Sequence, residues 1–78
     1  MGGIETLQMT GGSELSCAAR PDAEQVLYLE RGRLDVRAGE QRFHLGAGDF
    51  LFLPRGAGAD LHCSADERAC GFLIRGRD

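Results

Sequence analysis

The chain has 78 residues, of which 42% are hydrophobic and 27% are charged, and its formal net charge is −3. This composition argues against a disordered chain and a membrane-spanning segment, and a domain of this size buries only one modest core. The nine basic residues are all arginines, scattered from Arg20 to Arg77 among twelve acidic residues. Because nucleic-acid affinity depends on a basic surface, neither nucleic acid nor a membrane is an expected partner.

Alternation of apolar and polar residues with a period of two dominates the chain, and no stretch keeps a 3.6-residue apolar repeat for three turns. We expect about eight short strands, at residues 4–9, 14–19, 24–30, 34–38, 42–45, 50–54, 60–64 and 69–76. The second pair, 24–30 and 34–38, is predicted to form a hairpin about Gly32, and "GEQ" to reverse the chain again. The strand 50–54 is apolar on both faces, which predicts a central position in its sheet. The pattern therefore predicts one all-β domain over residues 1–78, a small antiparallel barrel or jelly roll.

The small size and the cysteines suggest how the domain exists in the cell. A core this small is marginally stable alone, so we expect a homodimer, and an unpaired edge strand at 4–9 or 69–76 would offer a second copy a place to pair. The N-terminus "MGGIETLQ" lacks the features of a signal peptide, so a cytoplasmic location is expected. Cys17, Cys63 and Cys70 match no zinc or redox spacing and are expected to be free thiols, with a Cys17–Cys63 disulfide as the alternative.

The glycine and proline spacing of residues 25–63 resembles that of the cupin superfamily. Gln25, "VLYLER" and Gly32 follow the first cupin motif, and "GAGDFLFLPRGA" is close to the wording of the second. The resemblance implies a cupin-like double-stranded β-helix, with a motif-bearing core over residues 14–76. In the second motif, Gly48 and Gly56 stand where the chain must turn sharply.

In the family, a metal is held by two histidines spaced by one residue, a glutamate and a further histidine. On this sequence the glutamate falls on Gln25 and the last histidine on Ala59. The histidine pair falls on Ala19 and Pro21, or on Ala18 and Arg20 if the turn is one residue longer. A divalent transition metal needs three or four imidazole, thiolate or carboxylate donors, so we expect no metal cofactor. The alternative is one divalent transition metal at an atypical site made by Cys17, Gln25 and Cys63.

Without a metal, the barrel mouth is left as the candidate site. Strand parity predicts that it is lined by Arg20, Gln25, Leu27, Ala59, Leu61 and Cys63. A mainly apolar pocket with one amide and one guanidinium suits a small organic ligand that carries a carboxylate or a hydroxyl. Alternatively, these side chains fill the barrel interior.

We therefore expect a metal-free cupin-like module that binds a small molecule or regulates, and the missing metal ligands argue against the usual cupin enzyme chemistry without deciding whether the chain is an enzyme. The first alternative is a cupin-superfamily enzyme of the isomerase or dioxygenase type, with an atypical metal site or an acid–base pair such as Tyr28 and Glu30. The second is an interaction module that pairs with another protein through an edge strand, which a filled barrel would favour. His44 and His62 are expected to face solvent, and Tyr28 to lie at a sheet or dimer interface.

Overall fold

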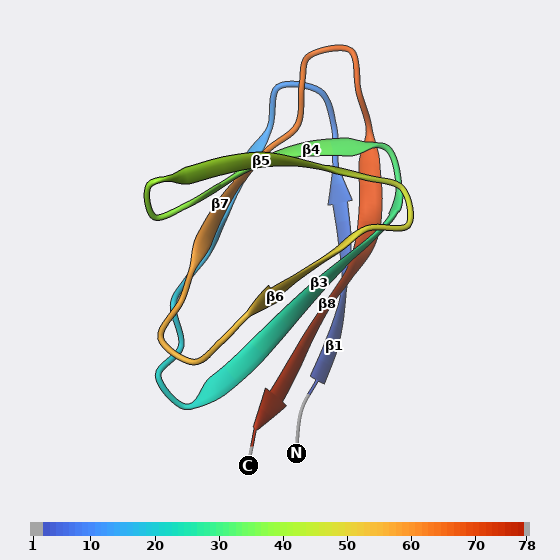
Figure 1. Cartoon of the computed structure of the whole chain (residues 1–78). Coiled ribbons are helices and arrows are strands. Elements are labelled where there is room, and N and C mark those ends of the chain that lie inside the picture. Colours follow the sequence, from blue (N-terminus) through green and yellow to red (C-terminus); the bar gives the residue numbers. More distant parts are fainter. Residues whose placement is uncertain (1–2, 78) are drawn as a thin grey trace.

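A computed structural model describes residues 3–77, and this part of the chain is all-β, with eight strands. They are β1 (Gly3–Met9), β2 (Glu14–Cys17), β3 (Ala23–Arg31), β4 (Arg33–Ala38), β5 (Gln41–Gly46), β6 (Phe50–Leu53), β7 (Ala59–His62) and β8 (Ala69–Arg77). All the pairings are antiparallel, and they build sheet A in the order β1-β8-β3-β6 and sheet B in the order β2-β7-β4-β5 (Figure 1). The predicted all-β jelly-roll class is confirmed. The described residues include no helix with the length and apolar character needed to cross a membrane.

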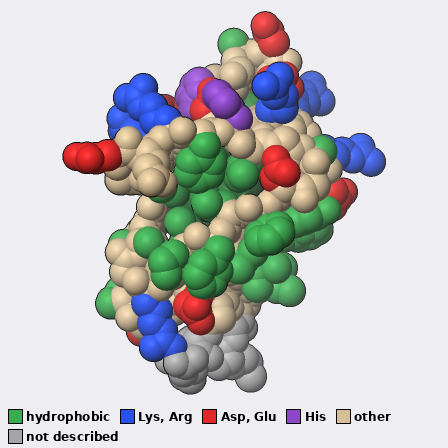
Figure 2. Space-filling model, in the orientation of Figure 1, with side chains coloured by type: hydrophobic (Ala, Val, Ile, Leu, Met, Phe, Trp, Pro, Cys, Tyr) green, Lys and Arg blue, Asp and Glu red, His purple; other side chains and the backbone are tan. Residues whose placement is uncertain are grey.

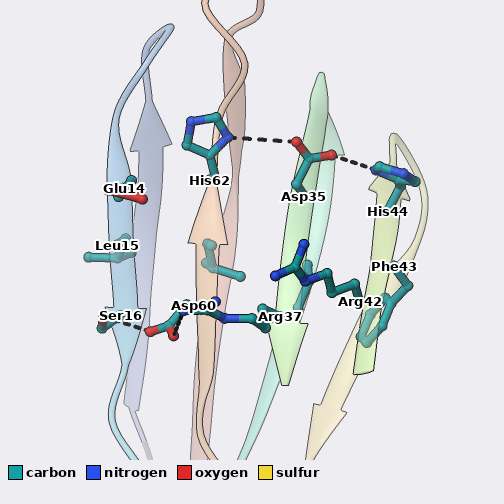
Figure 3. Close-up of a pocket in the computed structure, with 12 residues that line it drawn as sticks. Glu14, Leu15, Ser16, Asp35, Arg37, Arg42, Phe43, His44, Asp60 and His62 are labelled. Carbon is teal, nitrogen blue, oxygen red and sulfur yellow. Dashed lines mark hydrogen bonds and ion pairs between the residues drawn. The ribbon is translucent and has the colours of Figure 1, made fainter. Parts of the chain in front are cut away.

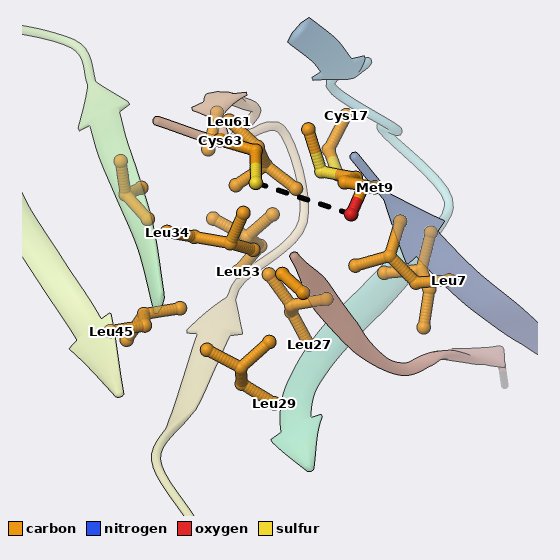
Figure 4. Packing of buried hydrophobic residues seen from close by; sticks show 14 residues of the cluster. Leu7, Met9, Cys17, Leu27, Leu29, Leu34, Leu45, Leu53, Leu61 and Cys63 are labelled. Atoms are coloured by element: carbon orange, nitrogen blue, oxygen red, sulfur yellow. Dashed lines mark hydrogen bonds between the residues drawn. The ribbon is translucent and has the colours of Figure 1, made fainter. Parts of the chain in front are cut away.

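The core lies between the two sheets, and it follows from the period-two pattern of the strands. Along β3, for example, Ala23, Gln25, Leu27 and Leu29 are buried while the residues between them are more exposed. Successive strand side chains point to opposite faces, so each alternating strand contributes one face to the interior. All eight strands add residues to a single apolar cluster (Figure 4).

The hairpin predicted about Gly32 is wrong. The strand before Gly32, β3, pairs with β6 and β8, whereas the strand after it, β4, pairs with β5 and β7. Gly32 therefore turns the chain from sheet A into sheet B, with a φ of +88°. The predicted turn at Gly32 is present, but a tight turn does not reveal which sheet the next strand joins. The second reversal is confirmed, because β4 and β5 form a hairpin in which Ala38 lies opposite Gln41.

The central position predicted for the strand 50–54 is also wrong. The strand observed there, β6, lies at the edge of sheet A and pairs only with β3 among the described strands. Its outward side chains Phe50 and Phe52 are 67% and 49% exposed. Apolar residues on both faces indicate that both faces favour burial, but they do not indicate that this chain buries both. The two glycines of the second motif behave as predicted, because Gly48 and Gly56 have φ values of +92° and +82°.

Candidate functional site

Five of the six predicted pocket residues lie in the barrel interior, the space enclosed between the two sheets. Gln25, Leu27, Ala59, Leu61 and Cys63 are 0–6% exposed and pack among the other core side chains. Arg20 lies apart, exposed in the connection between β2 and β3, where its carbonyl accepts a hydrogen bond from the Gly56 amide at 2.8 Å. The interior is thus occupied by the chain's own side chains, and a ligand role for these residues stays a prediction.

The positions of the family's metal ligands do not fit a metal in this chain. Gln25 is 1% exposed, and its side-chain Nε2 already donates to the Ala18 carbonyl at 3.1 Å. Ala18, Ala19 and Ala59 have no side-chain donor atom to offer. Within residues 3–77, no group of three His, Cys, Asp or Glu side chains is arranged to hold a metal ion. Transition metals require several such donors, so the residues present do not match the metal that the family implies.

The two interior cysteines, Cys17 and Cys63, are buried free thiols. Cys17 and Cys63 are 6% and 0% exposed and form no disulfide. Burial raises the pKa of the Cys17 thiol, although the nearby Arg75 guanidinium acts in the opposite direction. The Cys63 thiol donates to the Glu67 carbonyl at 3.3 Å and lies 4.0 Å from the Met9 carbonyl (Figure 4). Metals bind the thiolate form, so the alternative site of Cys17, Gln25 and Cys63 gains no support from this geometry.

This burial predicts slow thiol chemistry. We expect iodoacetamide to modify Cys17 and Cys63 of the folded protein at least about a hundredfold more slowly than in the unfolded protein, because the reactive species is an accessible thiolate. Mass spectrometry of peptides after timed alkylation measures the rates. The same reaction in guanidinium chloride is the control, in which both thiols react freely. Modification of the folded protein at the unfolded rate would contradict the packing described above.

One end of the barrel carries an ion pair that the sequence patterns did not reveal. Arg75 of β8 pairs with Glu5 of β1, and Arg75 also lies opposite Gln25 of β3 in the strand register. The Arg75 side chain is 27% exposed, and its Nε is buried without a hydrogen-bond partner among the described residues. Side chains two residues apart on a strand share a face, and this alternation could have located the pair. Glu5 precedes the inward-facing Leu7 by two residues, and Arg75 follows the inward-facing Leu73 by two.

The outer face of sheet B carries a groove of about 670 Å³ that runs across all four strands. Its polar side chains form two rows of neighbours in the strand register (Figure 3). One row is Glu14, His62, Asp35 and His44, and the other is Ser16, Asp60, Arg37 and Arg42. These eight side chains come from β2, β7, β4 and β5 in that order, so each row crosses the whole sheet. The groove, hereafter the sheet B groove, brings both signs of charge onto one surface.

In the first row, Asp35 lies between the two histidines. Its carboxylate oxygens are 2.5 Å from His44 Nδ1 and 3.6 Å from His62 Nδ1 (Figure 3). The hydrogen bond from His44 is the main cause that lowers the pKa of the Asp35 carboxyl. Both imidazoles are solvent-facing as predicted, with side-chain exposures of 73% for His44 and 47% for His62. Asp35 therefore holds the His44 ring through its Nδ1 atom, whereas His62 Nδ1 lies beyond hydrogen-bond distance of the carboxylate.

In the second row, Asp60 is satisfied by its neighbours but Arg42 is not. The Asp60 carboxylate accepts a hydrogen bond from Ser16 Oγ at 2.8 Å and lies 3.6 Å from Arg37 Nη2. Arg42 reaches from β5 across β4, and within residues 3–77 it makes no ion pair or side-chain hydrogen bond (Figure 3). An unpaired guanidinium with fixed polar neighbours is a site at which an anion can bind.

A comparison with models of known protein families finds a match over most of the chain. Residues 6–69 match the family described as the EutQ-like cupin domain, which is more than half of the sequence. The chain belongs to the EutQ-like cupin family. A comparison with curated proteins found no match.

Solved structures support the cupin fold at low sequence identity. The cupin domain of Cnp3 from Schizosaccharomyces pombe superposes with a TM-score of 0.89 at 14% identity, and the match covers 99% of this chain and 53% of that one. A cupin protein from Bacteroides fragilis gives 0.89 at 13% identity, with 97% and 65% covered. A predicted oxalate decarboxylase from Thermotoga maritima gives 0.87 at 12% identity, with 96% and 65% covered. This chain thus spans between half and two-thirds of the length of these structures, and the likeness shows the fold alone.

The sheet B groove of this cupin lies outside the barrel, whereas the residues that the family motifs mark lie inside it. On the sequence alone, His44 and His62 lie on separate strands, and no motif marks Asp35 or Arg42 as site residues. The signal that joins them is the pairing of β4 with both β5 and β7. That second pairing is between strands distant in sequence, so no local pattern reveals it.

Proposed function

We propose that this EutQ-like cupin domain is a metal-independent, non-catalytic module that binds a small organic anion in the sheet B groove. The observation that carries the proposal is the Arg42 guanidinium, which makes no ion pair or side-chain hydrogen bond among the described residues. In the same groove, Arg37 pairs with Asp60 and Asp35 pairs with His44. A guanidinium binds a carboxylate through two parallel hydrogen bonds, which gives both affinity and orientation. The ligand class is therefore a small organic carboxylate.

The neighbours of Arg42 support such a ligand. Arg37 adds a second guanidinium in the same row, and its ion pair with Asp60 is long, at 3.6 Å, and exposed. His44 lies on the same face of β5, and Asp35 holds its ring in place. Exposed ion pairs contribute little, so Arg37 can turn to a ligand at small cost. The groove volume of about 670 Å³ lies within the range of small-molecule sites.

The alternatives have less support. A metal-dependent dioxygenase or isomerase would need donors that Gln25 and Ala59 do not supply. Tyr28, suggested as half of an acid–base pair, lies on the outer face of sheet A, away from the sheet B groove. The filled interior supports a binding or interaction role rather than chemistry inside the barrel. Free cysteines fit a reducing compartment, which supports the cytoplasmic location within this proposal.

An NMR titration tests the site directly. We expect succinate to shift the amide resonances of Arg37, Arg42 and His44 in a saturable way. Arg42→Gln is expected to weaken succinate binding at least about tenfold, because one charge-assisted contact is lost. Arg68→Gln, in the turn between β7 and β8, is the control, because it changes the net charge equally outside the groove. Equal affinity of wild type and Arg42→Gln, or no saturable shift, would refute the groove as the site.

Elemental analysis of the purified protein tests the metal-independent part separately. We expect less than about one-tenth of an equivalent of any transition metal, because the donors that hold such ions are missing. A stoichiometric metal that survives dialysis would contradict this part of the proposal whatever the succinate titration shows.

A further inference from the structure

His44 lies where a ligand bound to Arg42 can reach it. The two residues share the outer face of β5, and two residues along a strand span roughly 7 Å. His44 lines the sheet B groove and also a smaller pocket of about 350 Å³ next to it. Its side chain is 73% exposed. Figure 2 shows the histidine side chains at the surface, with arginine side chains on either side of them.

The contact with Asp35 determines which ring nitrogen of His44 carries the proton. His44 Nδ1 lies 2.5 Å from a carboxylate oxygen of Asp35. This hydrogen bond holds the pKa of the Asp35 carboxyl below its usual value, so the carboxyl stays ionised and can only accept. Nδ1 is therefore the donor, and in the neutral ring the other nitrogen, Nε2, has a lone pair and no proton. A neutral His44 thus offers an acceptor at Nε2, and an acceptor repels a carboxylate.

A protonated His44 can bind the anion that the neutral ring repels. An imidazolium carries a proton on both nitrogens, so it can donate to Asp35 through Nδ1 and to a carboxylate through Nε2. Within residues 3–77 the ring makes no other hydrogen bond. We propose that His44 takes up one proton from solvent when an organic dicarboxylate binds, with one carboxylate on Arg42 and the other on His44 Nε2. This inference rests on the anion site proposed above, and it specifies the ligand as a dicarboxylate.

The charges around His44 have both signs. Arg33 and Asp35 of β4 and Asp66 and Glu67 of the turn between β7 and β8 line the smaller pocket with it. The sheet B groove adds Arg42 of β5, Arg37 of β4, Asp60 and His62 of β7, and Glu14 of β2. The carboxylates favour the imidazolium and the guanidinium groups oppose it, so a bound dicarboxylate adds negative charge that favours the protonated ring. By linkage, protonation must strengthen dicarboxylate binding by the same factor.

Calorimetric titrations at fixed ionic strength measure this linkage. We expect the dissociation constant of succinate to rise at least about tenfold between about pH 6.5 and pH 8.5, because a histidine loses its charge in this range. Titrations in buffers of different ionisation enthalpy should show net proton uptake on binding. Butyrate has the same carbon chain with one carboxylate, so it contacts Arg42 alone. Its dissociation constant should change less than about threefold over the same pH range.

Asp35→Asn tests Asp35 as the residue that positions the proton. An asparagine amide can donate to Nδ1, so the neutral His44 ring can carry its proton on Nε2 and donate to succinate. We expect this variant to bind succinate more tightly than wild type at the higher pH, with a pH dependence of less than about threefold. Glu14→Gln is the matched control, because it removes a carboxylate at the far end of the same row and should keep the wild-type pH dependence.

His44→Gln removes the titrating group and keeps Arg42. We expect this variant to bind succinate about as weakly at both pH values as wild type does at the higher one, and circular dichroism confirms that each variant is folded. A wild-type affinity that does not change with pH, or a pH dependence that survives His44→Gln or Asp35→Asn, would overturn the proton uptake while the groove remains the site. No saturable succinate binding at either pH would refute the groove and this inference together.

Discussion

A Gly32→Ala substitution is expected to leave the domain unfolded, with a loss of folding free energy of more than about 4 kcal/mol. Gly32 has a φ of +88°, which alone costs an alanine about 1–2 kcal/mol. In addition, a Cβ at this position would lie 1.8 Å from the Arg68 carbonyl oxygen and 2.8 Å from the Ala69 Cα. Both atoms belong to the backbone at the start of β8, so no side-chain rotation relieves the clash. The turn that carries the chain from sheet A to sheet B would have to move away from β8.

Gly39→Ala is the matched control for this prediction. Gly39 also has a positive φ, +63°, but a Cβ there meets no atom within 4 Å. We expect this variant to fold and to lose only about 1 kcal/mol, the cost of the backbone conformation alone. Far-UV circular dichroism and urea titration at one fixed protein concentration compare the two variants. Similar unfolding midpoints for Gly32→Ala and Gly39→Ala would show that the contact with β8 is not what requires glycine.

The strands could be predicted from the sequence because their pattern is local. Alternation along "EQVLYLE", for example, located β3 to within one residue at each end and predicted that Gln25 and Leu27 point inward. The pairing of the strands could not be predicted in this way. Gly32 marks a sharp turn whether the next strand pairs with β3 or crosses to the other sheet. Likewise, the apolar side chains on the outer face of β6 indicate that this face favours burial. They do not indicate which surface would cover the face.

For the candidate site, too, local patterns predicted some features, and the pairing of distant strands determined the others. Strand alternation placed Gln25 and Ala59 on the inward faces of their strands, and the structure buries both side chains, at 1% and 6% exposure. The sheet B groove depends on β7 lying beside β4, a pairing of strands that lie far apart in the sequence. His62, Asp35 and His44 become neighbours only through that pairing. Arg42 shows the same dependence, because it joins the row of Asp60 and Ser16 only through the pairings of β4 with β5 and β7 and of β7 with β2.

The two proposals have a common physical basis in the filled interior. A small domain has few residues with which to build a core, and here Leu27, Ala59, Leu61 and Cys63 complete it. A cavity for a ligand at these positions would remove apolar contacts that the domain needs. A binding surface on the outer face of a sheet imposes no such cost, since the inward residues of each strand remain packed. The alternation of the strands thus lets sheet B carry the polar groove while its other face stabilises the fold.

A Leu29→Ala substitution is expected to measure how much the filled interior contributes, with a loss of about 3–4 kcal/mol in the free energy of unfolding. Leu29 is 0% exposed, and its backbone amide and carbonyl are fixed by hydrogen bonds to Asp49 and Gly48, at 2.9 Å and 2.8 Å. The site cannot collapse easily around the missing methyl groups, so a cavity remains. Leu15→Ala, at a leucine that is 39% exposed, is expected to cost less than about 1 kcal/mol. Urea unfolding at a fixed protein concentration keeps any dimer contribution constant, and the dependence on urea should keep its slope. Equal losses for the two variants would show that the barrel interior is loosely packed and has room for a ligand after all.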